Sequence, residues 1–265
     1  MQKIKLQDIQ NLKDNRGIEI QKVGVKNVEV PLIIQRKHAS EQVVSAKATM
    51  SVALPAHFKG THMSRFIEIL CEWGQRNLLG VDIKGCLHEV AEKLEAESAE
   101  VSFSFKYFVE KQAPVSKLSS PMGYDCLFQG ILSGETYKFI LGVTVPVTTL
   151  CPCSKEISDY GAHNQRAVIN VKIVYDEKDM VWIEDLIELI ESCGSSPVYP
   201  ILKREDEKFV TEYAYNNPKF VEDVLRDVVT KLRGIDCVKW LEVDCEAFES
   251  IHNHSAWAYQ EETVQ

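Results

Sequence analysis

Two different periods of hydrophobic and polar positions follow one another along the chain, and they predict strands and helices in turn. In EVSFSFKYFV, apolar and aromatic side chains occupy every second position from Val101 to Tyr107, which predicts a half-buried strand. In SRFIEILCEW the apolar residues recur three and four positions apart, which predicts a helix over 64–77 that Ser64 could cap. The same spacing predicts a second helix over 82–97.

The rest of the chain continues this pattern, with turn and capping signals between the segments. Further strands are predicted at 26–35, 42–54, 122–132, 136–149, 166–175 and 236–248, and a last short strand up to about residue 259. Helices are predicted at 180–192 and 218–233. Gly194 and Gly234 follow their ends, while Asn217 and Pro218 suit the start of the second.

The order strand, strand, helix, helix, strand, strand therefore occurs twice, without a repeat at the level of residues. Such an order predicts an α+β protein with two units, each an antiparallel sheet with helices on one face. We place the first unit at 21–134 and the second at 135–265. Residues 1–20 form a polar arm to which the pattern assigns no structure.

Composition narrows the class of protein. The 265 residues are 45% hydrophobic and 26% charged, which is typical of a globular protein with a core. No stretch approaches the roughly 18 apolar residues of a membrane span, and the polar start lacks a signal-peptide core. With eight cysteines and no export signal, we expect a cytoplasmic protein with reduced thiols and no membrane partner.

The net charge of −9 argues against a protein that coats nucleic acid, so no nucleic-acid partner is expected. An anionic small molecule is not excluded, because a basic pocket can lie within an acidic protein.

The stretch PVTTLCPCSKEISDYGAHNQR, at 146–166, carries the most chemical information. It joins two predicted strands and is polar and too long for a hairpin turn. Thiolates and imidazoles, here Cys151, Cys153 and His163, are the usual ligands of zinc-like cations. Cysteines two positions apart face the same side only where the backbone is extended, so both need not bind.

Two further clusters could complete such a site. ESIHNHSAW contains His252 and His254, and LKREDEKFVTE contains Glu205 and Glu207. Cysteine, histidine and carboxylate together could supply three protein ligands and leave a position open for water. That pattern is typical of a catalytic metal and indicates a metal-dependent hydrolase of unknown substrate.

Simpler interpretations exist for several of these residues. Cys-Pro-Cys could be a redox pair, the REDEK run could be a solvated loop, and Glu222 could be a first-turn carboxylate favoured by the helix dipole. The remaining cysteines lie in apolar segments and are predicted to be core thiols. These are Cys71, Cys86, Cys126, Cys193, Cys237 and Cys245.

The sequence resembles the GTP cyclohydrolase type IB family. The resemblance rests on VPVTTLCPCSKEISDYGAHNQR, on LKREDEKFVTE followed by NPKFVEDVLRDV, on KGTHMSRF at 59–66 and on HNHSAWA at 252–258. It implies tandem tunnelling-fold (T-fold) units, each a four-stranded antiparallel sheet with two helices on one face. It also implies a homotetramer with active sites at subunit interfaces.

The implied reaction converts GTP and water to 7,8-dihydroneopterin triphosphate and formate, the first step towards tetrahydrofolate or another pterin or deazapurine. The resemblance implies one divalent cation per subunit, Mn²⁺, Fe²⁺ or Zn²⁺, bound by Cys151, His163 and Glu207, with Glu205 as a rival to Glu207. A carboxylate in place of a thiolate makes the site harder, which favours Mn²⁺ or Fe²⁺.

The other roles also follow from the resemblance. Cys153 and His252 would lie beside the metal, either to transfer protons or to hydrogen-bond its ligands, and His254 is a secondary candidate. Glu222 would anchor the guanine edge through two parallel hydrogen bonds. The candidates for the triphosphate pocket are Lys155, Arg166, His62 and Arg65.

Two other classes of function compete with this one. Another T-fold enzyme, such as a pyruvoyl-tetrahydropterin-synthase-like lyase or a nitrile reductase, would share the anchoring glutamate but would release no formate from GTP. A metal-stabilised module that binds a nucleotide without turning it over would unfold when its metal is removed.

Overall fold

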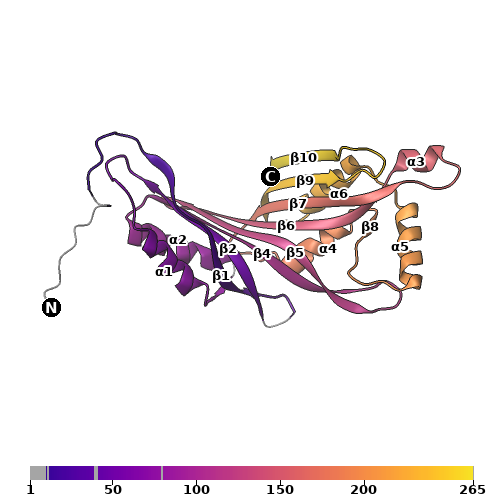
Figure 1. Ribbon diagram of the computed structural model, residues 1–265, viewed down its shortest axis with the longest axis horizontal. Helices are drawn as coiled ribbons and strands as arrows, with labels where there is room; N and C mark the ends of the chain where they lie inside the picture. Colours follow the sequence, from indigo (N-terminus) through magenta and orange to yellow (C-terminus); the bar gives the residue numbers. More distant parts are fainter. Residues whose placement is uncertain (1–9, 11, 39–40, 79, 265) are drawn as a thin grey trace. The chain divides into compact units, whose positions relative to one another are not determined.

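The computed structural model describes residues 10, 12–38, 41–78 and 80–264 (Figure 1). The strands are β1 (Ile20–Gln35), β2 (Glu41–Leu54), β3 (Asn77–Leu78), β4 (Ser98–Gln112), β5 (Ser119–Ser133), β6 (Thr136–Leu150), β7 (Asn164–Tyr175), β8 (Ser196–Pro197), β9 (Val238–Ala247) and β10 (Ala256–Thr263). The helices are α1 (Met63–Trp73), α2 (Gly80–Leu94), α3 (Pro152–Ile157), α4 (Ile183–Glu191), α5 (Arg204–Asn216) and α6 (Val221–Arg233).

The chain forms two compact units. The first contains the described residues up to Phe105 together with Leu127–Phe139, and the second contains Lys106–Cys126 and the described residues from Ile140 onward. Strands β4, β5 and β6 therefore contribute residues to both units.

In the first unit, β2 pairs antiparallel with β1 on one side and β4 on the other. Strand β3 adds a short parallel pair to β1. Alternate residues of β2, including Ala48 and Met50, are fully buried, as are Phe66 of α1 and Leu87 of α2. Apolar faces of the sheet and of α1 and α2 thus exclude water from one another, which stabilises the unit.

In the second unit, β6, β7, β9 and β10 pair antiparallel in that order. Helix α6 packs on β9 and β10, and α4 contacts α6. The α6 side chains that recur at helical spacing are buried, and they include Val224, Val228 and Leu232. Antiparallel sheets with helices confirm the predicted α+β class.

The boundaries of three helices differ from the prediction. Helix α1 begins at Met63, so His62 and not Ser64 stands at its N-cap. Helix α6 begins at Val221 with Phe220 as its N-cap, and not with the predicted Asn217. Asn217 is instead the C-cap of the preceding helix, α5. Helix α4 ends at Glu191 with Ser192 as its C-cap, so Gly194 lies beyond the cap, whereas Gly234 caps α6 as predicted.

Two helices were not predicted. The charged REDEK run, for which a loop was considered, lies in α5, where only Asp206 and Ala214 are buried. Helix α3 follows Cys151 and begins with Pro152, whose fixed φ suits a first helical position. None of its residues is buried, so it has no apolar stripe that a sequence pattern could reveal.

The described part of the N-terminal arm is paired, although no structure was predicted for it. The Asp14 amide donates to the His57 carbonyl at 3.0 Å, and the Lys59 amide donates to the Leu12 carbonyl at 3.0 Å. Residues 1–9 and 11 lie outside the described residues. Backbone hydrogen bonds therefore join the described part of this segment to the chain before α1.

The cysteine prediction is right for most positions and wrong for one. Cys86, Cys126, Cys193 and Cys245 are buried, and Cys237 is partly exposed. Cys71 is exposed, because it falls outside the stripe of α1 that buries Phe66, Ile69, Leu70 and Trp73. Among the described residues, no helix combines the length and the apolar character that crossing a membrane requires.

Candidate functional site

Strand register gathers the chemically informative loops at one end of the sheet of the second unit. Leu150, the last residue of β6, pairs with Asn164, the first of β7. Ala247, the last residue of β9, pairs with Ala167 of β7 and with Ala256 of β10. The loops 151–163 and 248–255 therefore leave the sheet at the same end.

Hydrogen bonds close the loop that carries Cys151 and His163. The Cys151 amide donates to the His163 carbonyl at 3.1 Å, and the His163 amide donates to Ser154 Oγ at 3.2 Å. Cys151 is the N-cap of α3, and its Sγ accepts a hydrogen bond from the Ser154 amide at 3.4 Å. The thiolate is the form of cysteine that binds cations.

The ring of His163 is held by two side chains that the sequence prediction did not include. Its Nδ1 lies 3.0 Å from Gln165 Oε1 and 3.7 Å from Glu249 Oε2. Gln165 Nε2 donates to Thr149 Oγ1 at 3.1 Å and to Glu249 Oε1 at 3.4 Å, so the amide oxygen faces the ring. With Nδ1 as the donor to Gln165, Nε2 is the ring nitrogen that could bind a metal, as in many metal-binding histidines.

Cys151 and His163 thus fit one side of a cation site in their donor chemistry. Glu207 does not join them in a group of three. In the described ranges 10, 12–38, 41–78 and 80–264, no three His, Cys, Asp or Glu side chains gather closely enough to hold a metal. Glu205 and Glu207 are both exposed on the first turn of α5.

Asp206, between these two glutamates, has the opposite environment. It is fully buried, and its carboxylate accepts hydrogen bonds from the amides of Val115, Ser116 and Lys203 at 2.8–2.9 Å. Ser116 Oγ donates a fourth at 2.6 Å. Burial raises the pKa of Asp206, but the bonds from Ser116, Lys203 and Val115 outweigh it and lower the pKa well below its usual value. Asp206 is therefore ionised at neutral pH, and its hydrogen bonds hold the first turn of α5 in place.

The candidates for proton transfer are exposed. Cys153 lies on α3, two positions beyond Cys151. The rings of His252 and His254 stack with their centroids 5.1 Å apart and an angle of 18° between them. Both lie in the loop 248–255, which also carries Glu249 beside His163. The structure therefore brings the histidine pair to the same sheet end as Cys151 and His163.

Glu222 reaches this end of the unit through the start of α6. It is exposed in the first turn, and the Phe220 amide donates to Asp223 Oδ2 at 3.0 Å. The Lys219 amide donates to the Leu150 carbonyl at 3.0 Å. The segment that leads into α6 is thus tied to the last residue of β6, immediately before Cys151.

The four basic candidates are divided between the two units. Lys155 Nζ donates to the Tyr215 carbonyl at 2.5 Å and lies 4.3 Å from the centre of the Tyr215 ring. Arg166 is exposed on β7. His62 and Arg65 belong to the first unit, where both line a small hollow beside α2 and Arg65 Nη1 donates to the Lys93 carbonyl at 2.6 Å.

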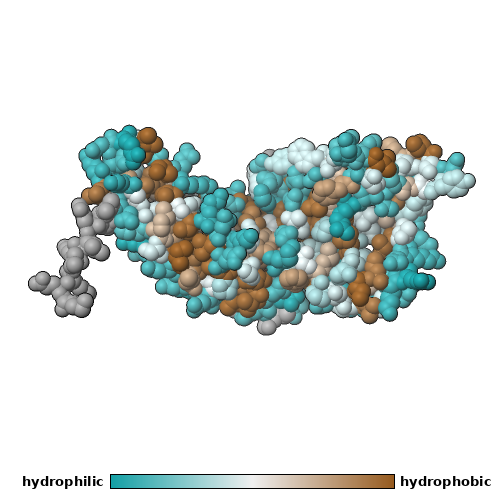
Figure 2. All heavy atoms as spheres, viewed as in Figure 1, coloured by the Kyte–Doolittle hydropathy of each residue, from teal (hydrophilic) through white to brown (hydrophobic). Residues whose placement is uncertain are grey.

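Apolar side chains are exposed beside this polar site. In the loop between β6 and β7, Ile157 is 83% exposed and Tyr160 is 99% exposed. Figure 2 shows hydrophobic surface at α3 among the hydrophilic atoms around it.

Comparison with known proteins agrees with this fold and with the Cys151 and His163 pair. Residues 6–258 match the family model described as type I GTP cyclohydrolase FolE2. The chain belongs to the FolE2 family.

Curated FolE2 relatives align over nearly the whole chain. "GTP cyclohydrolase FolE2" of Geotalea uraniireducens is 54% identical over 253 residues, which cover 96% of this chain and 92% of the relative. The protein of the same name from Geobacter sulfurreducens is 53% identical over 252 residues, which cover 95% of this chain and 96% of the relative.

Solved structures share the fold of this FolE2 chain without close sequence similarity. Uricase from Arthrobacter globiformis aligns with a TM-score of 0.54 and 7% identity over 92% of this chain and 93% of that one. A urate oxidase mutant from Bacillus sp. TB-90 aligns with a TM-score of 0.52 and 10% identity over 92% and 98%. These are T-fold proteins, and the predicted T-fold is confirmed.

Proposed function

We propose that the protein is a GTP cyclohydrolase I of type IB, which converts GTP and water to 7,8-dihydroneopterin triphosphate and formate. Membership of the FolE2 family carries this conclusion. Within the structure, the supporting observation is the backbone hydrogen bond that brings Cys151 and His163 together. The His163 ring is oriented by Gln165 at Nδ1, which leaves Nε2 available for a metal. The product would enter folate synthesis or another pterin or deazapurine pathway.

One divalent cation per subunit, Mn²⁺, Fe²⁺ or Zn²⁺, would be held by Cys151, His163 and Glu207, with Glu205 as the rival third ligand. When bound, such a cation supplies an acidified water molecule as the nucleophile for C8 of the guanine. Gln165 and Glu249 hold the His163 ring in the tautomer that leaves Nε2 free. A mixed thiolate, imidazole and carboxylate set favours Mn²⁺ or Fe²⁺ more than an all-thiolate site would.

His252, His254 and Cys153 would move protons during ring opening. N7 and N9 of the guanine must be protonated as the bonds to C8 break, and an imidazole titrates in the pH range where it can both give and take a proton. The exposure of the two stacked rings leaves them accessible to a substrate.

Glu222 would hold the N1–H and amino group of the guanine with its two carboxylate oxygens. Arg166, Lys155, His62 and Arg65 would contribute positive charge for the triphosphate. Lys155 would have to exchange its bond to the Tyr215 carbonyl for a phosphate oxygen. His62 and Arg65 would act from the first unit.

We further propose a cytoplasmic homotetramer with neither membrane nor nucleic acid as a partner. The exposed Ile157 and Tyr160 in the loop between β6 and β7 support burial of this loop against a second copy of the chain. A partner copy could then bring a third metal ligand to Cys151 and His163.

The decisive experiment uses chelator-stripped protein, GTP, and Mn²⁺, Zn²⁺ or no added metal. Formate is measured directly, and the pterin by its fluorescence after oxidation and dephosphorylation. Formate and pterin that both depend on metal would establish the reaction and rank the metals. Neither product from folded, metal-bound protein would refute the proposal and favour a different T-fold chemistry, such as that of a lyase or nitrile reductase.

A further inference from the structure

Leu150, the residue before Cys151, is hydrogen-bonded on both sides of its backbone by elements outside its own sheet pair. Its amide donates to Ser195 Oγ at 3.1 Å, and its carbonyl accepts from the Lys219 amide at 3.0 Å. Ser195 is fully buried, and its own amide donates to the Thr148 carbonyl at 2.8 Å. Two different segments of the second unit therefore form hydrogen bonds with the end of β6.

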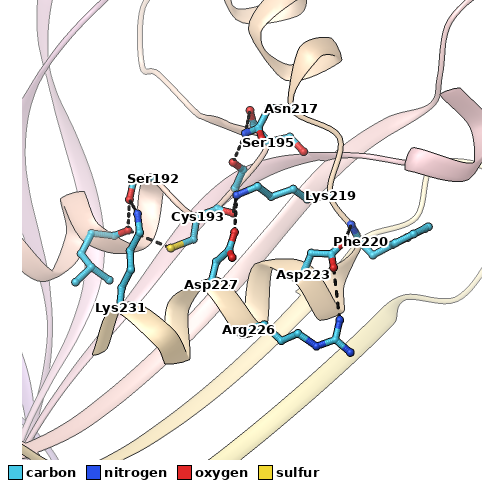
Figure 3. A network of polar contacts seen from close by, with 12 residues as sticks. Ser192, Cys193, Ser195, Asn217, Lys219, Phe220, Asp223, Arg226, Asp227 and Lys231 are labelled. Atoms are coloured by element: carbon cyan, nitrogen blue, oxygen red, sulfur yellow. Dashed lines mark hydrogen bonds and ion pairs between the residues drawn. The ribbon is translucent and has the colours of Figure 1, made fainter. Parts of the chain in front are cut away.

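These two segments are also bonded to each other (Figure 3). Asn217 Nδ2 donates to the carbonyls of Gly194 and Ser195, at 3.1 Å in each case. Lys219 Nζ donates to the Cys193 carbonyl at 3.0 Å and pairs with Asp227 at 2.7 Å. A Cβ on Gly194 would lie 2.6 Å from Val147 Cβ, so this turn packs directly on β6 and requires glycine.

The arrangement joins the elements that carry separate parts of the proposed site. Leu150 precedes Cys151, and Asn217 caps the end of α5, which carries Glu207. Lys219 leads into α6, which carries Glu222. We name the set formed by Ser195, Asn217 and the Leu150 backbone the clasp.

We propose that Ser195 and Asn217 are positioning residues that set the placement of the guanine anchor Glu222 relative to Cys151 and His163. This inference rests on the proposed function. Attack on C8 requires the nucleophile and the guanine ring in a defined geometry, and an error of about 1 Å can cost roughly a hundredfold in rate. Ser195 is fully buried and Asn217 bonds to backbone carbonyls, so in this proposal the clasp acts through the elements that it joins.

The first test compares Ser195→Ala with Ser196→Ala. Ser196 is also buried, and its hydroxyl donates to the carbonyl of its neighbour Pro197 and to no other described residue, so it is a matched control. We expect Ser195→Ala to lower kcat per metal-loaded site about tenfold or more, with KM for GTP and the Mn²⁺ dissociation constant within about twofold of wild type. Ser196→Ala should keep the wild-type kcat.

Hydrogen exchange gives a readout that does not depend on catalysis. The Leu150 amide loses its acceptor in Ser195→Ala, so it should exchange at least about tenfold faster in metal-free protein, whereas Ser196→Ala should leave it protected. Unchanged exchange at Leu150 would contradict the clasp whatever the activity.

A second variant covers the case in which Ser195→Ala does not fold. Asn217→Asp keeps the shape of the side chain but directs carboxylate oxygens at the Gly194 and Ser195 carbonyls. Its control is Asn216→Asp, which makes the same change of charge at the exposed neighbouring residue. We expect the same selective loss of kcat in Asn217→Asp. If both clasp variants fold, bind Mn²⁺ and keep the wild-type kcat, the proposal is wrong.

The failure of the proposed function would look different. If wild-type protein itself releases no formate with any metal, the assigned reaction is wrong, and the exchange data at Leu150 still report on the clasp. If wild type is active and only the metal dissociation constant changes in Ser195→Ala, the clasp supports the metal ligands alone, which also overturns the proposed positioning of Glu222.

Discussion

The two units share an order of elements but differ in the connections between their strands. In the first unit, β1 ends at Gln35 and β2 begins at Glu41, which leaves only a short connection. In the second, β6 ends at Leu150 and β7 begins at Asn164, and the loop between them holds Cys151, Cys153 and His163. Helix α5 is a further addition to the second unit. The candidate metal ligands Cys151 and His163 thus lie in a connection that is long in the second unit and short at the first strand pair of the first unit.

The most severe test removes donors from the long loop. Combined Cys151→Ala and His163→Ala substitutions should abolish metal binding and lower formate release by about a thousandfold or more, because no other group would acidify the attacking water. Bound metal is measured by mass spectrometry of the purified protein. Cys71→Ala, at an exposed thiol of the first unit, is the matched control and should change neither quantity. Retention of both metal and activity in the double variant would refute the assignment.

The next test concerns the anchor on α6. Glu222→Gln should raise KM for GTP about a hundredfold, because a charged hydrogen bond contributes about 1.5–3 kcal/mol and an amide can accept from only one of the two guanine donors. Metal content should stay at the wild-type level. Glu212→Gln, at an exposed position of α5, controls for the loss of a surface carboxylate. An unaltered KM would mean that Glu222 serves only the helix dipole.

A smaller effect would show whether the first unit takes part in binding at all. His62→Ala with Arg65→Ala should weaken GTP binding about tenfold and leave guanosine binding unchanged, because only GTP carries the triphosphate. Equilibrium binding to metal-free protein measures both ligands. Arg16→Ala removes an exposed arginine that pairs with Asp14, and it should have no effect. An equal loss of affinity for GTP and guanosine would indicate that the substitutions disturb the fold around the hollow rather than remove a charge that binds the triphosphate.

The smallest effect is on stability. The folded pKa of Asp206 is lowered, so its stabilising contribution is complete above its unfolded pKa near 3.8 and is lost as the pH falls towards the folded value. Asp206→Asn should therefore lower Tm by several degrees at pH 7, and the difference from wild type should shrink below about pH 4. Scanning calorimetry across pH measures this. Glu212→Gln should show no such pH-dependent difference, and a constant difference for Asp206→Asn would contradict its ionised state.

Strands and most helices were predictable because their side chains alternate between core and solvent with a clear period. Helix α5 was not, because REDEKFVTEYAYN buries only Asp206 and Ala214 and so has no apolar stripe. The start of α6 was placed too early because Asn217 and Pro218 carry strong capping signals locally. In the fold, Asn217 instead donates to the Gly194 and Ser195 carbonyls, which lie far away in sequence.

The residues of the candidate site were likewise predictable only in part. The sequence indicated Cys151 and His163, which the loop joins. It did not indicate a role for Glu249, although this residue begins the ESIHNHSAW cluster, because only the fold places it beside His163. The sequence indicated Glu205 and Glu207 as candidate carboxylate ligands. Only the structure shows that both are exposed and that Asp206 between them is buried.

The uneven burial of the thiols also matters for handling the protein at the bench. Burial raises the pKa of Cys86 and of Cys245 to about 12, so these side chains stay protonated and shielded from alkylating reagents. Cys71 and Cys153 are exposed. In a Cys71→Ser, Cys237→Ser chain, a maleimide dye would report on the neighbourhood of Cys151 and Cys153. Labelling kinetics would then follow cation loading in real time, without any turnover of substrate.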